Sequence, residues 1–182
     1  MILYHGTTEV IGDIDLGKCR LRTDFGKGFY MSSKLGTARD WAIGKAGFSG
    51  IPTVIRFRIK DDIFANSALS YKRFDSPTEE WLNFIRDNRR MDIGNSNSPE
   101  PRHFYDIVTG PIANDKVADA VDRYCKGKIS IEDAIARVKA LPSVFQMSFH
   151  TALALTYVDQ RLTECQQRIQ RNTWSAWEKA HV

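Results

Sequence analysis

The fold is decided by one stretch near the N-terminus, GKGFYMSSKLGTARDWAIGKA at residues 26–46. Its first part, residues 28–33, is rich in aromatic and apolar side chains, which favours a β-strand. In its second part, residues 34–46, apolar side chains recur at helical spacing, which predicts an amphipathic helix. We therefore expect a strand that leads directly into a helix packed behind it.

Four further segments have patterns typical of strands, and three other segments have patterns typical of helices. The expected strands are residues 1–4, ending at the polar turn His5–Thr8, residues 53–59, 104–109, stopped by Gly110 and Pro111, and 143–149. The expected helices are residues 76–90 with Ser76 as N-cap and Glu79 completing a capping box, 130–141 with Ser130 as N-cap, and a long helix from Thr151 to about Arg171. The mixed order of these elements predicts an α+β fold.

In two of these strands, the alternation of side chains predicts which residues share a face. In residues 53–59 it predicts a half-exposed strand. In residues 143–149 it places Gln146, Ser148 and His150 on the face opposite Phe145, Met147 and Phe149. The Gly, Asn, Ser and Pro content of Met91–Arg102 predicts a long loop within a single domain of residues 1–182.

The composition limits the kind of protein. The chain has 182 residues, 42% of them hydrophobic, which suits one compact domain. Its net charge of +4 is a mild bias spread along the chain, so a nucleic-acid partner is permitted but not indicated. Cys19, Cys125 and Cys165 lie far apart, which predicts neither a disulfide framework nor a metal site. With no apolar run long enough to span a bilayer, we expect a cytoplasmic protein that does not bind membranes.

Three short segments together suggest a chemistry that none suggests alone. They are Tyr4-His5-Gly6-Thr7, Gly26-Lys27-Gly28-Phe29-Tyr30, and Trp41, eleven residues after the second segment. In this combination they resemble the His-Tyr-Glu branch of the ADP-ribosyltransferases, which includes diphtheria toxin and the poly(ADP-ribose) polymerases. The chain is also similar to an uncharacterised bacterial family of ADP-ribosyltransferase-like toxins, through residues 24–30, 105–111 and 146–151.

The resemblance implies an ADP-ribosyltransferase-like fold, in which a split pair of mixed or antiparallel sheets is flanked by helices. It implies NAD+ as co-substrate, with His5 bonded to the adenosine ribose and with the Gly6 backbone and Thr7 hydroxyl holding the nicotinamide carboxamide. Tyr30 and Trp41 would sandwich the cationic nicotinamide ring. Gly28 would belong to the same NAD+ site.

Gln146 occupies the position where these enzymes carry a catalytic glutamate, so the expected catalytic set is His5, Tyr30 and Gln146. A glutamine keeps a hydrogen bond to the ribose but brings no negative charge to the cation-like transition state. Three explanations stay open: an acceptor that arrives already nucleophilic, a second carboxylate such as Asp106 or Asp115, or a site that binds NAD+ without turnover. His150, Asn114 and Asp115 are candidates for contacts with the acceptor. The alternatives are a strand-end histidine bonded to the backbone for His150 and an ordinary turn for Asn114 and Asp115.

The resemblance leads us to expect an NAD-dependent mono-ADP-ribosyltransferase, the toxin of a bacterial toxin–antitoxin pair. Its partners would be NAD+, a protein or nucleic-acid acceptor and a cognate antitoxin. The alternatives are a catalytically weak or silent NAD+ or ADP-ribose binding module, or an NAD+ glycohydrolase. An RNA 2′-phosphotransferase-like enzyme ranks third, because this chain has only Arg20, Arg22 and Lys27 near the site in sequence. Trp174 and Trp177 would cover the domain or contact a partner.

Overall fold

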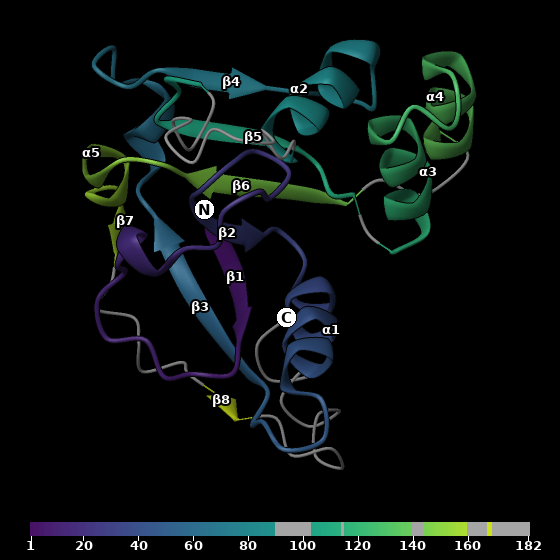
Figure 1. Ribbon diagram of the computed structural model, residues 1–182. Coiled ribbons are helices and arrows are strands. Elements are labelled where there is room, and N and C mark those ends of the chain that lie inside the picture. Colours follow the sequence, from purple (N-terminus) through teal and green to yellow (C-terminus); the bar gives the residue numbers. More distant parts are fainter. Residues whose placement is uncertain (90–102, 114, 140–143, 160–166, 169–182) are drawn as a thin grey trace.

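The structure, a computed structural model, describes residues 1–89, 103–113, 115–139, 144–159 and 167–168 (Figure 1). Within these residues, one mixed β-sheet has the strand order β4-β5-β6-β2-β1-β3-β7, and β8 also pairs with β3. The β4–β5 pairing is parallel and the other pairings are antiparallel. The strands are β1 (Ile2–Thr7), β2 (Phe29–Ser32), β3 (Thr53–Ile59), β4 (Tyr71–Arg73), β5 (Ile107–Pro111), β6 (Phe145–Phe149), β7 (Val158–Asp159) and β8 (Gln167–Arg168).

Helices cover the two halves of the sheet separately. In Figure 1, α1 lies beside β1 and β3, whereas α3 and α4 lie side by side near the end of β5 and β6. The helices are α1 (Leu35–Ala46), α2 (Glu79–Arg89), α3 (Asp115–Cys125), α4 (Ile131–Lys139) and the short α5 (Ala152–Leu155). None of the helices in these segments is long and apolar enough to cross a membrane.

The two halves meet at a short junction between β1 and β2. These strands pair only at Tyr4 and Ser32, and Figure 1 shows β4, β5 and β6 running across the direction of β1 and β3. The expected pair of sheets is therefore one hydrogen-bonded sheet with a change of direction at its centre, and the α+β class is confirmed.

Three apolar clusters hold these layers together. One lies under β1, β2, β3 and β6 and includes Phe29, Met31, Ile55, Phe57 and Phe149. A second packs α2, α3 and α4 against β5, around Phe25, Trp81, Val108, Val121 and Ala134. The smallest joins α1 to β3 through Leu35, Ala38, Ala42 and Val54.

The local patterns identified several elements correctly. The strand-to-helix unit at residues 29–46 is present, and β3 and β6 occupy the expected segments. Ser130 caps α4, since its hydroxyl accepts a hydrogen bond from the Asp133 amide at 3.2 Å. Thr151 caps α5 in the same way, through the Ala154 amide.

Both remaining helix predictions were wrong in extent. Thr78, not Ser76, caps α2, because its hydroxyl accepts from the Trp81 amide at 3.2 Å. The long helix after Thr151 ends at Leu155, because Val158 takes up an extended conformation and pairs with Ile59 of β3. Helix α3 and the edge strand β4 were not predicted.

Three strand predictions also need correction. β1 continues through His5 and Gly6 to Thr7, since β3 pairs with it that far. β5 starts only at Ile107 and does not stop before Gly110, because it pairs with β6 as far as Pro111. β3 is half-exposed only toward its C-terminal end: α1 covers Val54, Arg56 is partly buried and Arg58 is exposed.

Some expectations lie outside the described residues. They are the loop Met91–Arg102, Asn114, the side chain of Asp115, the tryptophan pair at positions 174 and 177, and most of the expected helix beyond residue 159.

Candidate functional site

The predicted catalytic residues come from three neighbouring strands at the centre of the sheet. Gln146 lies on β6, Tyr30 on β2 and His5 on β1, and the sheet order places these strands next to one another. The register pairs Tyr30 with Ser148 and Ser32 with Gln146, so Tyr30 and Gln146 lie on the same face of the sheet.

Hydrogen-bond alternation shows where the backbone of β1 points. Met1 and Ile59 exchange both backbone hydrogen bonds, at 2.9 and 2.8 Å. In an antiparallel ladder such pairs alternate, so Leu3, His5 and Thr7 bond toward β3. The N–H and C=O of Gly6 must point the other way, toward β2, beyond the Tyr4–Ser32 pair at which the pairing of these strands ends.

His5 occupies the position where a continuous ladder would have joined the two strands. Its Nδ1 lies 2.7 Å from the Tyr30 carbonyl oxygen, which an unbroken register would have paired with Gly6. Burial lowers the pKa of His5 from 6.5 to about 4, and the Lys45 ammonium acts in the same direction. A neutral ring that donates from Nδ1 to a carbonyl has a hydrogen-bond acceptor at Nε2. The imidazole also stacks on Phe29, with ring centroids 4.3 Å apart.

Gly6 is required by the packing of α1. A Cβ at this position would lie 2.0 Å from the Ala38 carbonyl oxygen and 3.0 Å from the Ala42 nitrogen, both backbone atoms of the helix. The resemblance implies that the Gly6 backbone holds the nicotinamide carboxamide, and the structure adds the close approach of a helix at this position. Without it, α1 could not lie directly over β1.

Thr7 and Trp41 differ in accessibility. Thr7 is buried, and its hydroxyl accepts a hydrogen bond from the Glu9 amide at 3.2 Å. Trp41 lies on α1 and is 56% exposed. No ring contact between Trp41 and Tyr30 occurs in the described part of the chain, so the expected aromatic sandwich is not preformed by direct contact. An exposed indole can still stack on a ligand.

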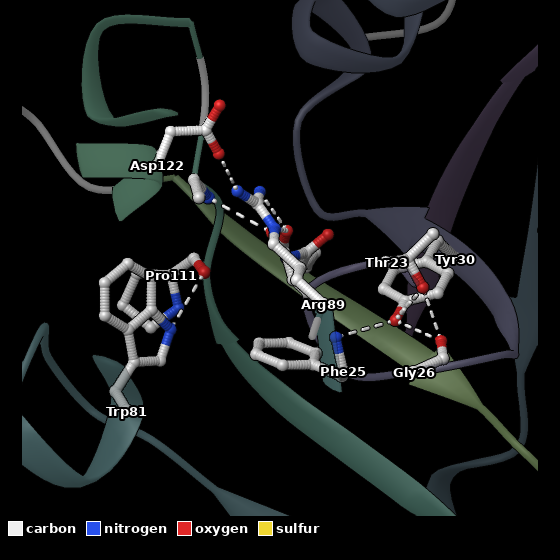
Figure 2. Close-up of polar contacts among 11 residues, drawn as sticks. Thr23, Phe25, Gly26, Tyr30, Trp81, Arg89, Pro111 and Asp122 are labelled. Carbon is white, nitrogen blue, oxygen red and sulfur yellow. Dashed lines mark hydrogen bonds and ion pairs between the residues drawn. The ribbon is translucent and has the colours of Figure 1, made fainter. Parts of the chain in front are cut away.

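The Tyr30 hydroxyl anchors the loop that precedes β2. Figure 2 shows it between Thr23, Phe25 and Gly26: it donates to the Gly26 carbonyl at 2.7 Å and accepts from the Phe25 amide at 2.9 Å. The Thr23 hydroxyl donates to it at 2.8 Å. Burial raises the pKa of Tyr30 well above its ordinary value, so this phenol stays neutral. Tyr30 therefore shapes the site through the loop and through a ring that is only partly buried.

The two glycines of this loop have separate structural reasons. Gly26 has a φ of 78°, a conformation that favours glycine at the end of a turn. At Gly28, a Cβ would lie 2.6 Å from Nδ1 of His150. That imidazole lies 2.8 Å from the Lys27 carbonyl oxygen and 2.8 Å from the Ser148 hydroxyl, and burial lowers its pKa to about 4. Gly28 thus makes room for His150, which holds the loop.

Gln146 contacts a carboxylate that the sequence analysis did not single out. Its Nε2 donates to Oδ2 of Asp24 at 2.8 Å. The other oxygen of Asp24 accepts from Nη2 and Nε of Arg89, at 2.5 and 3.1 Å. Figure 2 shows the Arg89 guanidinium reaching Asp122 on its far side, at 3.3 Å. Asp24 begins the Asp-Phe-Gly-Lys-Gly segment already quoted for the resemblance, but its pairing with a residue 122 positions away leaves no local pattern.

The other candidate carboxylate has a structural role. Asp106 accepts hydrogen bonds from the Ser70 amide and hydroxyl, at 2.7 and 2.8 Å, and from the Thr151 hydroxyl, at 2.6 Å. Burial acts to raise its pKa, but these hydrogen bonds outweigh it and lower the pKa below the ordinary value. Asp106 thus ties β5 to the start of α5.

A shallow groove of roughly 620 Å³ lies elsewhere, between α2, α3 and α4. Arg86, Asn83 and Tyr124 line it, and its position away from β1, β2 and β6 separates it from the predicted residues. The described residues contain no cluster of His, Cys, Asp and Glu able to hold a metal ion.

The fold and the junction define an α+β protein with a polar site at the centre of a mixed sheet. The chain belongs to the family described as protein of unknown function (DUF3990), whose model matches residues 1–159. No curated protein and no solved structure matches the chain.

Proposed function

We propose that this chain is an NAD+-dependent mono-ADP-ribosyltransferase. The observation that carries the proposal is the junction of β1 and β2, where a neutral His5 and the backbone of Gly6 adjoin Tyr30 and, one strand further, Gln146. The strands that carry His5, Tyr30 and Gln146 are separated in sequence and adjacent in the sheet. This adjacency supports the likeness in fold as well as in sequence.

The groups at the junction suit the two polar ends of NAD+. Nε2 of the neutral His5 can accept a hydrogen bond from a ribose hydroxyl. The N–H and C=O of Gly6 point to the same side of β1 and complement the C=O and NH2 of a carboxamide. The indole of Trp41, exposed on α1, can stack on the nicotinamide cation, a contact worth about 0.5–2 kcal/mol.

The chemistry requires little proton transfer at the leaving group. The bond between the ribose carbon and the nicotinamide nitrogen breaks, and its electron pair neutralises the pyridinium. The acceptor atom forms a new bond to that carbon and releases its proton to solvent or to a base. The sugar becomes cation-like at the transition state, so an oxygen atom aimed at its hydroxyl stabilises it.

A second candidate function is an NAD+ or ADP-ribose binding module without turnover. Gln146 favours it, because a neutral amide lacks the charge of the usual carboxylate, a difference of roughly 3–4 kcal/mol in transition-state stabilisation. Transfer remains our first proposal because Asp24 supplies a carboxylate in direct contact with that amide. A toxin acting on a macromolecular acceptor is the setting that the resemblance implies.

Incubation with NAD+ labelled on its adenylate phosphate tests the proposal. Wild-type protein should attach label to acceptors in a bacterial extract, and His5→Ala and Tyr30→Ala should reduce labelling at least tenfold. Arg86→Ala, in the groove between α2, α3 and α4, is the matched control and should label normally. Release of free ADP-ribose without labelled acceptors would instead identify a glycohydrolase. Equal labelling by all variants would remove these residues from the site.

A further inference from the structure

The contact between Gln146 and Asp24 gives the glutamine a fixed polarity. An amide presents an oxygen at one end and an NH2 group at the other, and the two ends have nearly the same shape. A carboxylate accepts hydrogen bonds and donates none. The 2.8 Å contact with Asp24 therefore places the NH2 group of Gln146 against that oxygen and turns Oε1 away from it.

Arg89 fixes which oxygen of Asp24 faces the glutamine. Its guanidinium binds Oδ1 through both Nη2 and Nε, and Oδ2 is left for Gln146 and for the Ala113 amide, at 3.3 Å. The Asp24 side chain is 13% exposed and that of Arg89 is 21% exposed, so water competes little for this pair. Asp24 is thus held from three sides, by α2, by the segment after β5 and by β6.

Oε1 of Gln146 is the free end of this chain of contacts. It has no protein donor among the described residues and is absent from their buried, unpartnered side-chain atoms, so it reaches solvent. Gln146 lies on the same face of the sheet as Tyr30.

We propose that Asp24 is a positioning residue that locks the Gln146 amide with Oε1 toward the sugar of NAD+. The locked amide then performs the acceptor role of the glutamate found in related enzymes, and its NH2 group is kept away from the cation-like sugar. This inference rests on the proposed function.

Asp24→Asn tests the lock because it reverses the polarity of the contact. The Arg89 guanidinium can only donate hydrogen bonds, so it binds the asparagine oxygen, and the asparagine NH2 group then faces Gln146. The glutamine must turn its own oxygen inward and its NH2 group toward the sugar. We expect kcat for transfer to fall at least tenfold while the Kd for NAD+, measured by calorimetry, changes less than threefold.

Adding Gln146→Glu to Asp24→Asn should restore transfer to at least the wild-type rate, since a carboxylate can accept from the asparagine NH2 and aim its second oxygen at the sugar. Gln146→Glu alone places two carboxylates in contact and should lower the melting temperature. Asp122→Asn, which keeps the Asp24–Gln146 contact but changes the far side of Arg89, is the matched control and should retain the wild-type kcat.

The side-chain amide resonances of Gln146 report the lock without NAD+. They should be shifted and slowly exchanging in wild type and in Asp122→Asn, and should change in Asp24→Asn. An Asp24→Asn protein with unchanged resonances or unchanged kcat, or a double variant no more active than Asp24→Asn, overturns the inference while leaving the proposed function standing. A wild-type protein that shows the locked amide but binds no NAD+ defeats both.

Discussion

The two edges of β1 differ sharply although they belong to one strand. Toward β3, six consecutive residue pairs run from Ile2–Arg58 to Thr7–Thr53. Toward β2, a single pair joins Tyr4 to Ser32. On the paired edge, the backbone groups of Leu3, His5 and Thr7 form the ladder with β3. On the other edge, the backbone groups of Gly6 point toward β2 beyond the last residue pair of these two strands.

We propose that this difference separates the scaffold of the protein from its ligand-binding edge. The β3 edge and the helix above it are apolar and closely packed, around Ala38, Ala42 and Val54. The β2 edge carries a histidine bonded to a carbonyl and leads to the polar contacts of Gln146. A sheet that stops pairing at its centre offers backbone donors and acceptors to a ligand, which a complete ladder would not.

Gly6→Ala should disrupt the packing of α1 on β1 and give the largest effect. The new Cβ would lie 2.0 Å from the Ala38 carbonyl oxygen, so α1 must move off β1. We expect the free energy of unfolding to fall by roughly 3 kcal/mol or more, measured by urea denaturation. A variant of unchanged stability would show that α1 does not rest on Gly6.

Low pH should have the second largest effect, a loss of folding stability through the buried histidines. His5 and His150 each have a pKa near 4 in the folded protein, against 6.5 ordinarily, mainly because of burial. Between these values the unfolded chain binds more protons, so stability should fall as the pH drops from about 6.5 to about 4, by up to roughly 3 kcal/mol for each histidine.

Urea denaturation across this pH range tests that expectation. His5→Gln should flatten part of the slope, because it removes one of the two titrating groups. A slope that is identical in the variant and in wild type would mean that His5 is not buried as a neutral ring.

Trp41→Ala should affect the ligand without affecting the fold. The indole is 56% exposed, so its loss should leave the melting temperature nearly unchanged. We expect NAD+ binding to weaken by about 0.5–2 kcal/mol in calorimetry, because the nicotinamide cation loses a stacking partner. Phe48→Ala, at another exposed aromatic after α1, should bind as wild type does.

Gly44→Ala should give the smallest effect and serves as the control for Gly6→Ala. Both glycines belong to the unit of β1 and α1, but a Cβ at Gly44 meets nothing within 4 Å. The substitution should stabilise the protein by roughly 0.5–1 kcal/mol, because alanine favours the helix. Destabilisation here would mean that any added methyl group disturbs α1.

The sequence predicted the elements whose signals are local. The strand and helix at residues 29–46 follow from apolar spacing within that stretch, and β3 from its alternation. The prediction of a long helix after Thr151 was wrong, because Val158 pairs with Ile59, 99 residues earlier in the chain. Long-range pairing of this kind overrides local helix preference.

The residues of the candidate site also fall into those predicted from the sequence and those that were missed. His5, Tyr30 and Gln146 were predicted from a resemblance, and the sheet places their strands side by side. Asp24 and Arg89 were missed, since their contacts join segments that no spacing relates. Gly6 and Gly28 were predicted as ligand residues, and the structure adds a packing reason for each.

The most direct test follows the backbone amides of β1 and β3 by NMR during titration with NAD+. We predict that the Gly6 amide and the Trp41 indole shift strongly, and that the amides of Ile55 and Phe57, which face the paired edge, shift little. Shifts confined to α2, α3 and α4, or no shifts at millimolar NAD+, would contradict it.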